Sequence, residues 1–213
     1  MKFYARLLTT LLLTCSLPAL AQTPAPVASP PPAETAVAPA PALQFYKYAH
    51  NDAEYSVALP EAPQVKTIWA DEEKVPYLEH PPLEGNLGEV ATFRRIDAKT
   101  EETFDVKITF LKADDKFLAG LTEEKMKAAL EDDYKGATLD NKDWHYSAGG
   151  GSLKWATLSG FSVDKSNRPY FNAEHYLTGK QSIMVIKVQY NVENQSFGEY
   201  YKALTDNIAY LSQ

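Results

Sequence analysis

Cysteine is almost absent from this chain of 213 residues, since Cys15 is the only one. It lies in a first segment that we expect to be removed, so the rest of the chain would hold neither a disulfide nor a thiol. A cysteine nucleophile, a thiolate metal site and a disulfide framework are thereby excluded for that remainder. Its stability must come from a hydrophobic core.

Long apolar runs are also missing. The longest, at residues 7–17, is interrupted by polar residues and is too short for a transmembrane helix, which needs about 20 apolar residues. A basic start at Lys2 and Arg6 precedes it, and a small-residue pattern ending at Ala21 follows it. These features are typical of a secretory signal. We therefore interpret residues 1–21 as a signal peptide cleaved after Ala21, and expect a periplasmic or secreted protein with no transmembrane segment.

Cys15 offers an alternative way of processing the same segment, because a cysteine after a short apolar run can be lipidated. The residue before it is Thr14, whereas such signals normally have Gly, Ala or Ser at that position. The cleavage pattern at Ala21 would then also have no purpose. We favour simple cleavage and keep a lipid anchor at Cys15 as the alternative.

Residues 22–43 form a segment rich in proline and alanine, with a single charge at Glu34. Its seven prolines are Pro24, Pro26, Pro30, Pro31, Pro32, Pro39 and Pro41. Such a composition cannot bury enough apolar surface to fold, and it favours an extended polyproline II conformation. We interpret the segment as a disordered linker, which is either a spacer that holds the domain away from a surface or a tail left after cleavage.

Basic charge is scarce in the remainder of the chain. Once Lys2 and Arg6 are removed, 19 basic residues face 28 acidic ones, which gives a formal net charge of −9. Nucleic acids and anionic membrane surfaces both attract clustered lysine and arginine. The charge therefore argues against both as partners.

Catalytic motifs are absent as well: the chain has no Gly-x-Ser-x-Gly, no His-Glu-x-x-His, no phosphate-binding loop and no dinucleotide fingerprint. Four widely separated histidines remain: His50, His80, His145 and His175. Glu174 and His175 are neighbours on a predicted strand, so their side chains should point to opposite faces. We expect no cofactor, no metal site and no enzyme.

Residues 44–213 are expected to form a single domain. Alternation of apolar and polar residues predicts most of its strands, and an unbroken apolar run predicts one that is buried on both faces. The predicted strands are 45–48, 55–59, 65–69, 90–96, 103–111, 144–146, 153–163, 170–177 and 183–190.

Two helices complete the predicted domain. Thr122 should cap the first helix, whose apolar stripe continues to Tyr134. The second should begin at a capping box formed by Ser196 and Glu199 and continue to Leu211. The predicted fold class is therefore α+β, with an antiparallel sheet of about six to eight strands packed against two main helices.

The order of these elements, together with one motif, resembles a known family. The motif Tyr55-Ser56-Val57-Ala58-Leu59-Pro60 follows an N-terminal hairpin, as in the PsbP and DcrB-like exported domains. The resemblance covers about residues 45–211 and implies an α/β/α sandwich that serves as a non-enzymatic accessory or binding module, without catalytic residues to carry over. The segment 71–86 and the glycines at 149–151 do not match the family pattern.

Aromatic residues are plentiful, with 13 Tyr, 9 Phe and 3 Trp. Six of them fall in or near predicted edge strands and loops: Tyr46, Tyr48, Trp69, Tyr77, Trp144 and Tyr170. They are either a binding patch or cross-strand pairs that stabilise the sheet. As a patch they are our predicted binding site.

Three functions are compatible with this sequence. The first is an exported accessory or binding module that contacts an envelope protein, and the second is a small-ligand or glycan binder that uses the aromatic patch and the loop 71–86. The third, hydrolysis at an unrecognised carboxylate site, lacks any sequence motif. A partner binder should expose an apolar patch, a ligand binder should have a concave pocket with convergent polar groups, and an enzyme should hold titratable groups with shifted pKa values in one cleft.

Overall fold

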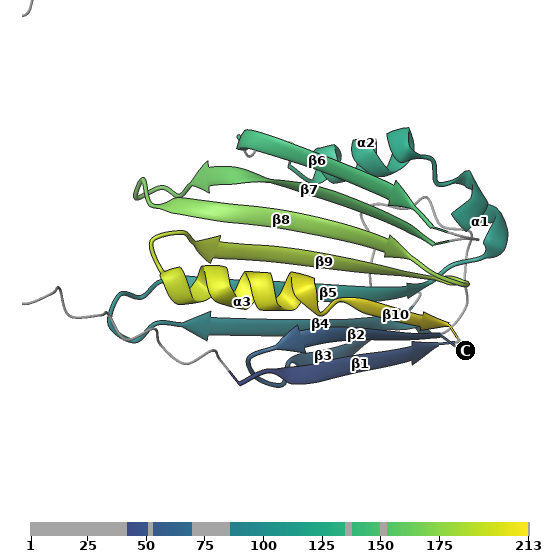
Figure 1. The fold of residues 1–213 in the computed structure, drawn as a ribbon, viewed down its shortest axis with the longest axis horizontal. Coiled ribbons are helices and arrows are strands. Elements are labelled where there is room, and N and C mark those ends of the chain that lie inside the picture. The colour runs from purple at the N-terminus through teal and green to yellow at the C-terminus, as the bar shows by residue number, and fades with distance from the viewer. Residues whose placement is uncertain (1–41, 51–52, 70–85, 135–137, 150–152, 213) are drawn as a thin grey trace, which may run out of the picture. The chain divides into compact units, whose positions relative to one another are not determined.

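Seven antiparallel strands form the main sheet of this protein (Figure 1). The computed structural model describes residues 42–50, 53–69, 86–134, 138–149 and 153–212. In spatial order the strands are β3 (Gln64–Trp69), β4 (Asn86–Ile96), β5 (Thr103–Lys112), β9 (Ser182–Asn191), β8 (Pro169–Thr178), β7 (Lys154–Val163) and β6 (Asp140–Ala148). The predicted α+β class with an antiparallel sheet is confirmed.

A second, three-stranded sheet was not predicted. It has the order β1 (Gln44–His50), β2 (Ala53–Leu59) and β10 (Ala209–Ser212), and all its pairs are antiparallel. The predicted pairing of the first two strands is confirmed, while their turn at residues 51–52 lies outside the described residues. Strand β10 closes this sheet from the far end of the chain.

Three helices are described: α1 (Asp115–Gly120), α2 (Glu123–Asp133) and α3 (Gln195–Asp206). The predicted cap of α2 is confirmed, because the Thr122 hydroxyl accepts a hydrogen bond from the Lys125 amide at 3.3 Å. Helix α1 was not predicted, although Asp114 caps it in the same way, accepting from the Phe117 amide at 2.6 Å. The start of each of these two helices is therefore fixed by a capping residue that lies next to it in the sequence.

The predicted boundaries of the last helix are wrong. Its N-cap is Asn194, and Ser196 lies inside the first turn, so no capping box forms. The helix also ends early, because the Asn207 side chain donates to the Ala203 carbonyl at 2.8 Å and the chain then leaves to pair with β2. Leu211, which the helical stripe included, belongs to β10.

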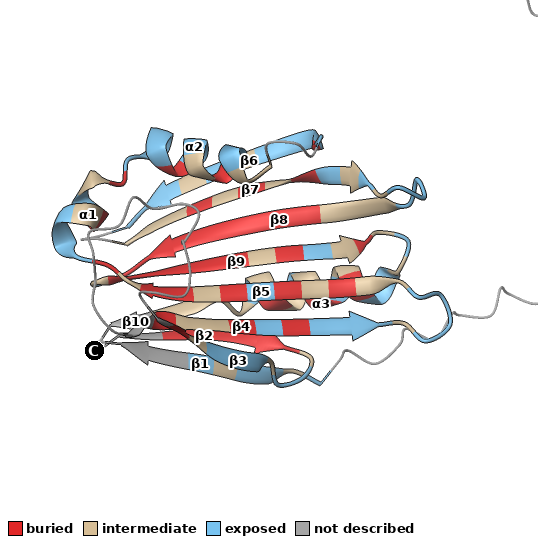
Figure 2. Cartoon of the chain, turned by 180° about the vertical axis from the view of Figure 1, so that it is seen from behind, coloured by how far each residue is buried: buried red, intermediate tan, exposed pale blue. Residues whose placement is uncertain are grey.

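Both faces of the main sheet are covered, by different elements. On one face α3 and strand β2 pack in a cluster that includes Phe104, Leu177 and Phe197. On the other face α1 and α2 pack in a cluster that includes Leu130 and Tyr176. Figure 2 shows that buried residues are concentrated along β5, β8 and β9, in the middle of the sheet. We call the two sides the α3 face and the α2 face.

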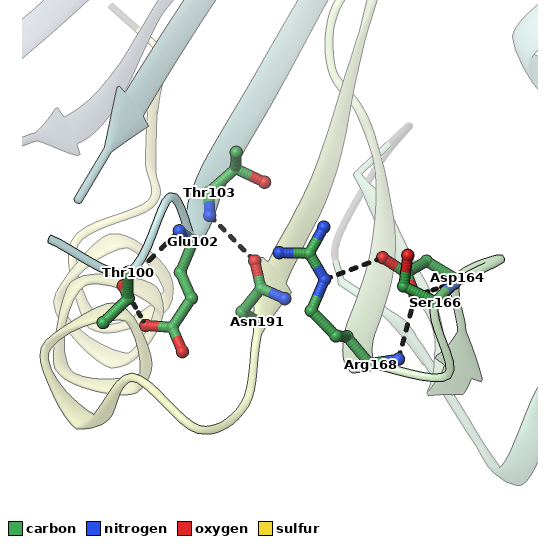
Figure 3. Close-up of polar contacts among 7 residues, drawn as sticks. All are labelled: Thr100, Glu102, Thr103, Asp164, Ser166, Arg168 and Asn191. Carbon is green, nitrogen blue, oxygen red and sulfur yellow. Dashed lines mark hydrogen bonds and ion pairs between the residues drawn. The ribbon is translucent and has the colours of Figure 1, made fainter. Parts of the chain in front are cut away.

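Polar contacts hold one end of the main sheet (Figure 3). The Asn191 side chain at the end of β9 accepts a hydrogen bond from the Thr103 amide at the start of β5, at 2.8 Å. In the turn between β7 and β8, Arg168 Nε donates to Asp164 Oδ2 at 3.0 Å. These bonds support the register that places the polar side chains of β5, β8 and β9 beside one another.

Candidate functional site

Polar side chains gather on the α2 face of the sheet, at the C-terminal end of α2. The apolar side of the helix does not extend over this part of the sheet. The polar side chains surround a cavity of about 280 Å³, which we call the carboxyl pocket. Its polar wall is formed mainly by Asp133 and Tyr134 from the end of α2, Asn172 and Glu174 from β8, and Lys187 and Gln189 from β9. The pocket thus combines residues that are far apart in the sequence.

Strand alternation and register explain this convergence. Glu174 pairs with Lys187 across β8 and β9, and both side chains face α2 because Tyr176, two residues along β8, also does. Asp133 is the last residue of α2, whose first turn is fixed by the Thr122 cap. The length of α2 therefore places the Asp133 carboxylate, rather than an apolar side chain, next to Glu174 and Lys187.

Glu174 is the most unusual residue of the pocket. Its side chain is 0% exposed, and among the described residues neither of its oxygens accepts a hydrogen bond. Lys187 Nζ forms an ion pair with the Asp133 carboxylate and lies 3.5 Å from Glu174 Oε1. One ammonium group therefore faces two carboxyl groups, and it is closer to Asp133.

Burial and crowding shift the pKa values of all three groups. Desolvation, followed by the neighbouring Asp133 carboxyl, raises the pKa of Glu174 to about 10. Desolvation also raises the pKa of Asp133 and lowers that of Lys187 to about 8. At neutral pH Glu174 is therefore protonated, while Lys187 keeps its charge beside Asp133.

The other polar residues of the wall satisfy one another. The Asn172 side chain donates to Ser162 Oγ at 2.8 Å and accepts from Gln189 Nε2 at 2.9 Å. Asp105 on β5 accepts from Arg94 Nε at 2.5 Å and from Arg94 Nη2 at 3.3 Å. Asn172 and Asp105 thus have hydrogen-bond partners, whereas both oxygens of Glu174 have none among the described residues.

His175 points to the opposite face, as its position next to Glu174 predicted. Thr157 Oγ1 lies 3.0 Å from its Nδ1, and the Tyr201 hydroxyl lies 3.3 Å from its Nε2. Burial lowers the pKa of His175 to about 4, so the imidazole is neutral near pH 7. Both ring nitrogens are engaged on the α3 face, and the residue takes no part in the pocket.

The six predicted aromatic residues are distributed over the protein. Tyr46 on β1 packs its ring 5.8 Å from that of Phe110 and donates a hydrogen bond to Glu89. Trp144 on the edge strand β6 donates to Glu123 at 3.2 Å, with the ammonium group of a lysine over its ring. The seven-strand order puts β9, β8 and β7 between β5, which Tyr46 contacts, and β6, which carries Trp144, so the structure does not bring the two rings together.

Of the remaining four members of this set, Tyr170 is not among the described residues that line the carboxyl pocket. Tyr170 is partly buried near the start of β8. Tyr48 lies on β1 and Trp69 ends β3. Tyr77 lies outside the described residues, as does the loop 71–85 that was predicted to act with it. The contacts of Tyr46 join the two sheets, and those of Trp144 join β6 to α2.

A small apolar surface does exist on the α3 face, at the end of β7. Phe161 is 40% exposed and Val163 is 62% exposed, and alternation places them on the same side of the strand. The Phe161 ring contacts that of Phe171 at 5.5 Å, and Phe171 in turn contacts Tyr201 of α3 at 5.0 Å. We call Phe161 and Val163 the β7 apolar surface.

Two charged residues in the sequence are signals from which the carboxyl pocket could have been predicted. Lys187 is a single charge within the apolar run of β9, and Glu174 is a charge on the neighbouring buried strand. Charged residues are seldom fully buried without a partner. What the sequence could not supply was the third member, Asp133, because its contact depends on how α2 packs.

The described residues hold neither a metal cluster nor a membrane-spanning helix. No three side chains of His, Cys, Asp or Glu come together there as a metal site would require. No helix in the same ranges has the length and apolar character of a membrane span.

Comparison with known proteins shows a similarity to solved structures. No family model and no curated protein matches the chain. The solution structure of cyanobacterial PsbP (CyanoP) from Synechocystis sp. PCC 6803 is similar, with a TM-score of 0.45 and 10% sequence identity, over 81% of this chain and 94% of that one. It belongs to the family that the order of predicted elements resembles, and at this identity the likeness concerns the arrangement of the chain alone and says nothing of function.

Proposed function

We propose that this protein is an exported, non-enzymatic binding module that takes up a small polar ligand in the carboxyl pocket. The observation that carries the proposal is Glu174, which lies fully buried in a cavity wall with neither oxygen accepting a hydrogen bond within the described residues. A buried polar group of this kind costs free energy unless a partner satisfies it. The basic, apolar and small-residue pattern of residues 1–21 supports export.

A binding role fits the pocket better than catalysis does. Its shifted pKa values are also typical of active sites, so the contrast rests on which groups are available. None of the described residues that line the pocket is Ser, Thr, Cys or His. Lys187 is the amine nucleophile of the described lining, and its pKa of about 8 and its ion pair with Asp133 keep it mainly protonated at neutral pH. The pocket therefore has groups that recognise a ligand and lacks an activated group that attacks one.

The test is a titration with three small probes of different charge: n-butylamine, butyrate and glucose. Backbone amide shifts of residues 172–174 and 187–189, measured by nitrogen-15 NMR, should respond to at least one probe. Glu174→Gln should weaken that response, whereas Glu199→Gln, on the exposed side of α3, should leave it unchanged. If no probe shifts these amides at millimolar concentration, the proposed function is wrong.

The β7 apolar surface favours a second candidate function, contact with an envelope protein. Exposed apolar side chains that adjoin one another are typical of interaction sites, and Phe161 and Val163 meet that description. A photo-crosslinking amino acid at position 163 should capture the same envelope protein in repeated experiments in intact host cells. The same group at Lys127, exposed on α2, is the matched control. Equal capture at both positions, or none at 163, would contradict this candidate.

A further inference from the structure

We infer that the ligand of the carboxyl pocket carries a primary ammonium group, which binds to Glu174 in exchange for its proton. The inference rests on the proposed function of the pocket and names the chemistry of its ligand. It goes beyond that function because it also fixes the charge of the ligand and the number of protons released.

The first argument is a count of charges. Asp105 is neutralised by Arg94, which reaches both of its carboxylate oxygens. Asp133 is neutralised by Lys187. Glu174 is the third carboxyl group of the wall. Lys187 is the one cation among the described lining residues, and Lys107, its neighbour on β5, is exposed to solvent. Without a ligand, a proton has to balance Glu174.

The second argument is geometric. Lys187 Nζ lies 3.5 Å from Glu174 Oε1, which is too far for a strong hydrogen bond, while it is in direct contact with Asp133. A second ammonium group would donate up to three hydrogen bonds and would supply both charge and donors to Glu174. The cavity of about 280 Å³ that Glu174 helps to line has room for a small amine or for the end of a lysine side chain.

Other ligand classes fit less well. A metal ion would need several ligating side chains, and the described residues contain no group of three. An anion would meet two carboxyl groups and one lysine that is already paired. A sugar offers neutral hydroxyl donors, which leave the proton of Glu174 in place. Only a cation removes the need for that proton.

The exchange is balanced in atoms and charge. The protonated carboxyl of Glu174 loses its proton to solvent, and the resulting carboxylate pairs with the ammonium group of the ligand, which keeps all its protons. No covalent bond between heavy atoms forms or breaks. One proton is released for each ammonium bound.

Several other titratable or charged groups on the surrounding elements face this site. They are Asp133 and Tyr134 from α2, Tyr176 from β8, Lys187 from β9, Asp105 and Lys107 from β5, and Arg94 from β4. Lys187 is the nearest with a pKa near the working range, at about 8, and it stays charged below that pH. Proton release between pH 6 and pH 7 therefore reports on Glu174.

The experiment is isothermal titration calorimetry of the full protein with n-butylamine at pH 6 and pH 7. At each pH it is run in two buffers whose ionisation enthalpies differ. We expect one proton released per bound amine, and a dissociation constant about tenfold lower at pH 7 than at pH 6. Glu174→Gln should abolish the proton release and weaken binding at pH 7 at least tenfold. Glu199→Gln should change neither quantity.

The outcomes separate this inference from the proposed function. If glucose or butyrate fills the pocket and n-butylamine does not, the inference is wrong and the proposed function stands; if none binds, both are wrong. Binding of n-butylamine without proton release also overturns the inference. Should Glu174→Gln fail to fold, Asp133→Asn provides a second variant, which should alter the pH dependence of binding. N-acetyl-lysinamide then distinguishes the source, because it binds only if a lysine side chain of a partner fits as well as a free amine.

Discussion

Glu174→Gln tests the protonation of the buried acid pair through the pH dependence of stability. The amide has nearly the shape of the protonated acid, but it does not titrate. Folded Glu174 holds its proton up to a pKa of about 10, whereas the unfolded chain releases it above the ordinary value of 4.5. The folded state therefore binds more protons than the unfolded state between these values. Since stability falls with rising pH in that case, Glu174 destabilises the fold progressively above pH 4.5.

The size of the effect follows from the same values. Each pH unit in this window costs about 1.4 kcal/mol of unfolding free energy. Between pH 5 and pH 7 the variant should therefore gain roughly 2 to 3 kcal/mol relative to the natural protein, starting from similar stability at pH 5. His175, with its pKa lowered to about 4, acts in the opposite sense, but equally in both proteins, so its contribution cancels.

Urea denaturation at pH 5, 6, 7 and 8, followed by tryptophan fluorescence, measures this difference directly. Trp144 and Trp155 lie in the two clusters that pack against the sheet, so their emission reports on unfolding. Glu199→Gln, an exposed position, should track the natural protein at every pH. If the difference between Glu174→Gln and the natural protein is flat with pH, the carboxyl is ionised in the folded state and the protonated acid pair is wrong.

Three further predictions use the same denaturation assay. Gly88→Ala should destabilise the protein by more than about 3 kcal/mol, because its φ is +151° and a Cβ would overlap the Phe110 carbonyl oxygen of the neighbouring strand; Gly120→Ala, where the nearest atom is 3.8 Å away, should have little effect. Thr122→Ala should lower the free energy of unfolding by about 1 kcal/mol through loss of the α2 cap, whereas Ser196→Ala should leave it almost unchanged because Asn194 is the cap of α3. Equal losses in the two variants would mean that Ser196 does cap α3. Leu130→Ala, at a fully buried position of α2, should cost about 2 to 5 kcal/mol, and a smaller loss would mean that α2 packs loosely.

Local patterns were enough to predict most strands and the start of α2. In β5 the alternating residues Phe104, Val106, Ile108 and Phe110 are all buried, as a period of two predicted. In β9 the unbroken apolar run is buried on both faces, because α2 and α3 cover opposite sides of the sheet. The Thr122 cap needed only residues within one helical turn. These features depend on neighbours in the sequence.

Features that depend on distant contacts were missed. The stripe of Tyr200, Leu204, Ile208 and Leu211 continues at helical spacing, yet the chain leaves the helix after Asp206 because β2 offers an edge to pair with. Strand β7 pairs regularly with β8 at Gly160, whereas the pairing of β7 with β6 shifts in register between Asp140 and Asp143. A side chain at position 160 would lie 3.1 Å from the Asp140 carbonyl oxygen. In both cases the local structure depends on pairing with a distant strand, which the local sequence pattern does not show.

The carboxyl pocket also combines local and distant features. The sequence pattern places Glu174 on a buried strand, and the packing of α2 brings Asp133 to it. Glu174 lies at the level of the sheet where α2 ends, opposite Leu158 on one side and Lys187 on the other. If this position served packing alone, glutamine would make the same contacts without a titrating group, and an apolar residue would avoid the buried polar atoms altogether. A carboxyl group has one property that these alternatives lack: it exchanges a proton for a cation. A sequence that keeps this group where its burial is most costly breaks a local rule, and such positions are typical of functional sites. A pocket that exchanges the proton of Glu174 for a cation would explain why a carboxyl group occupies this buried position.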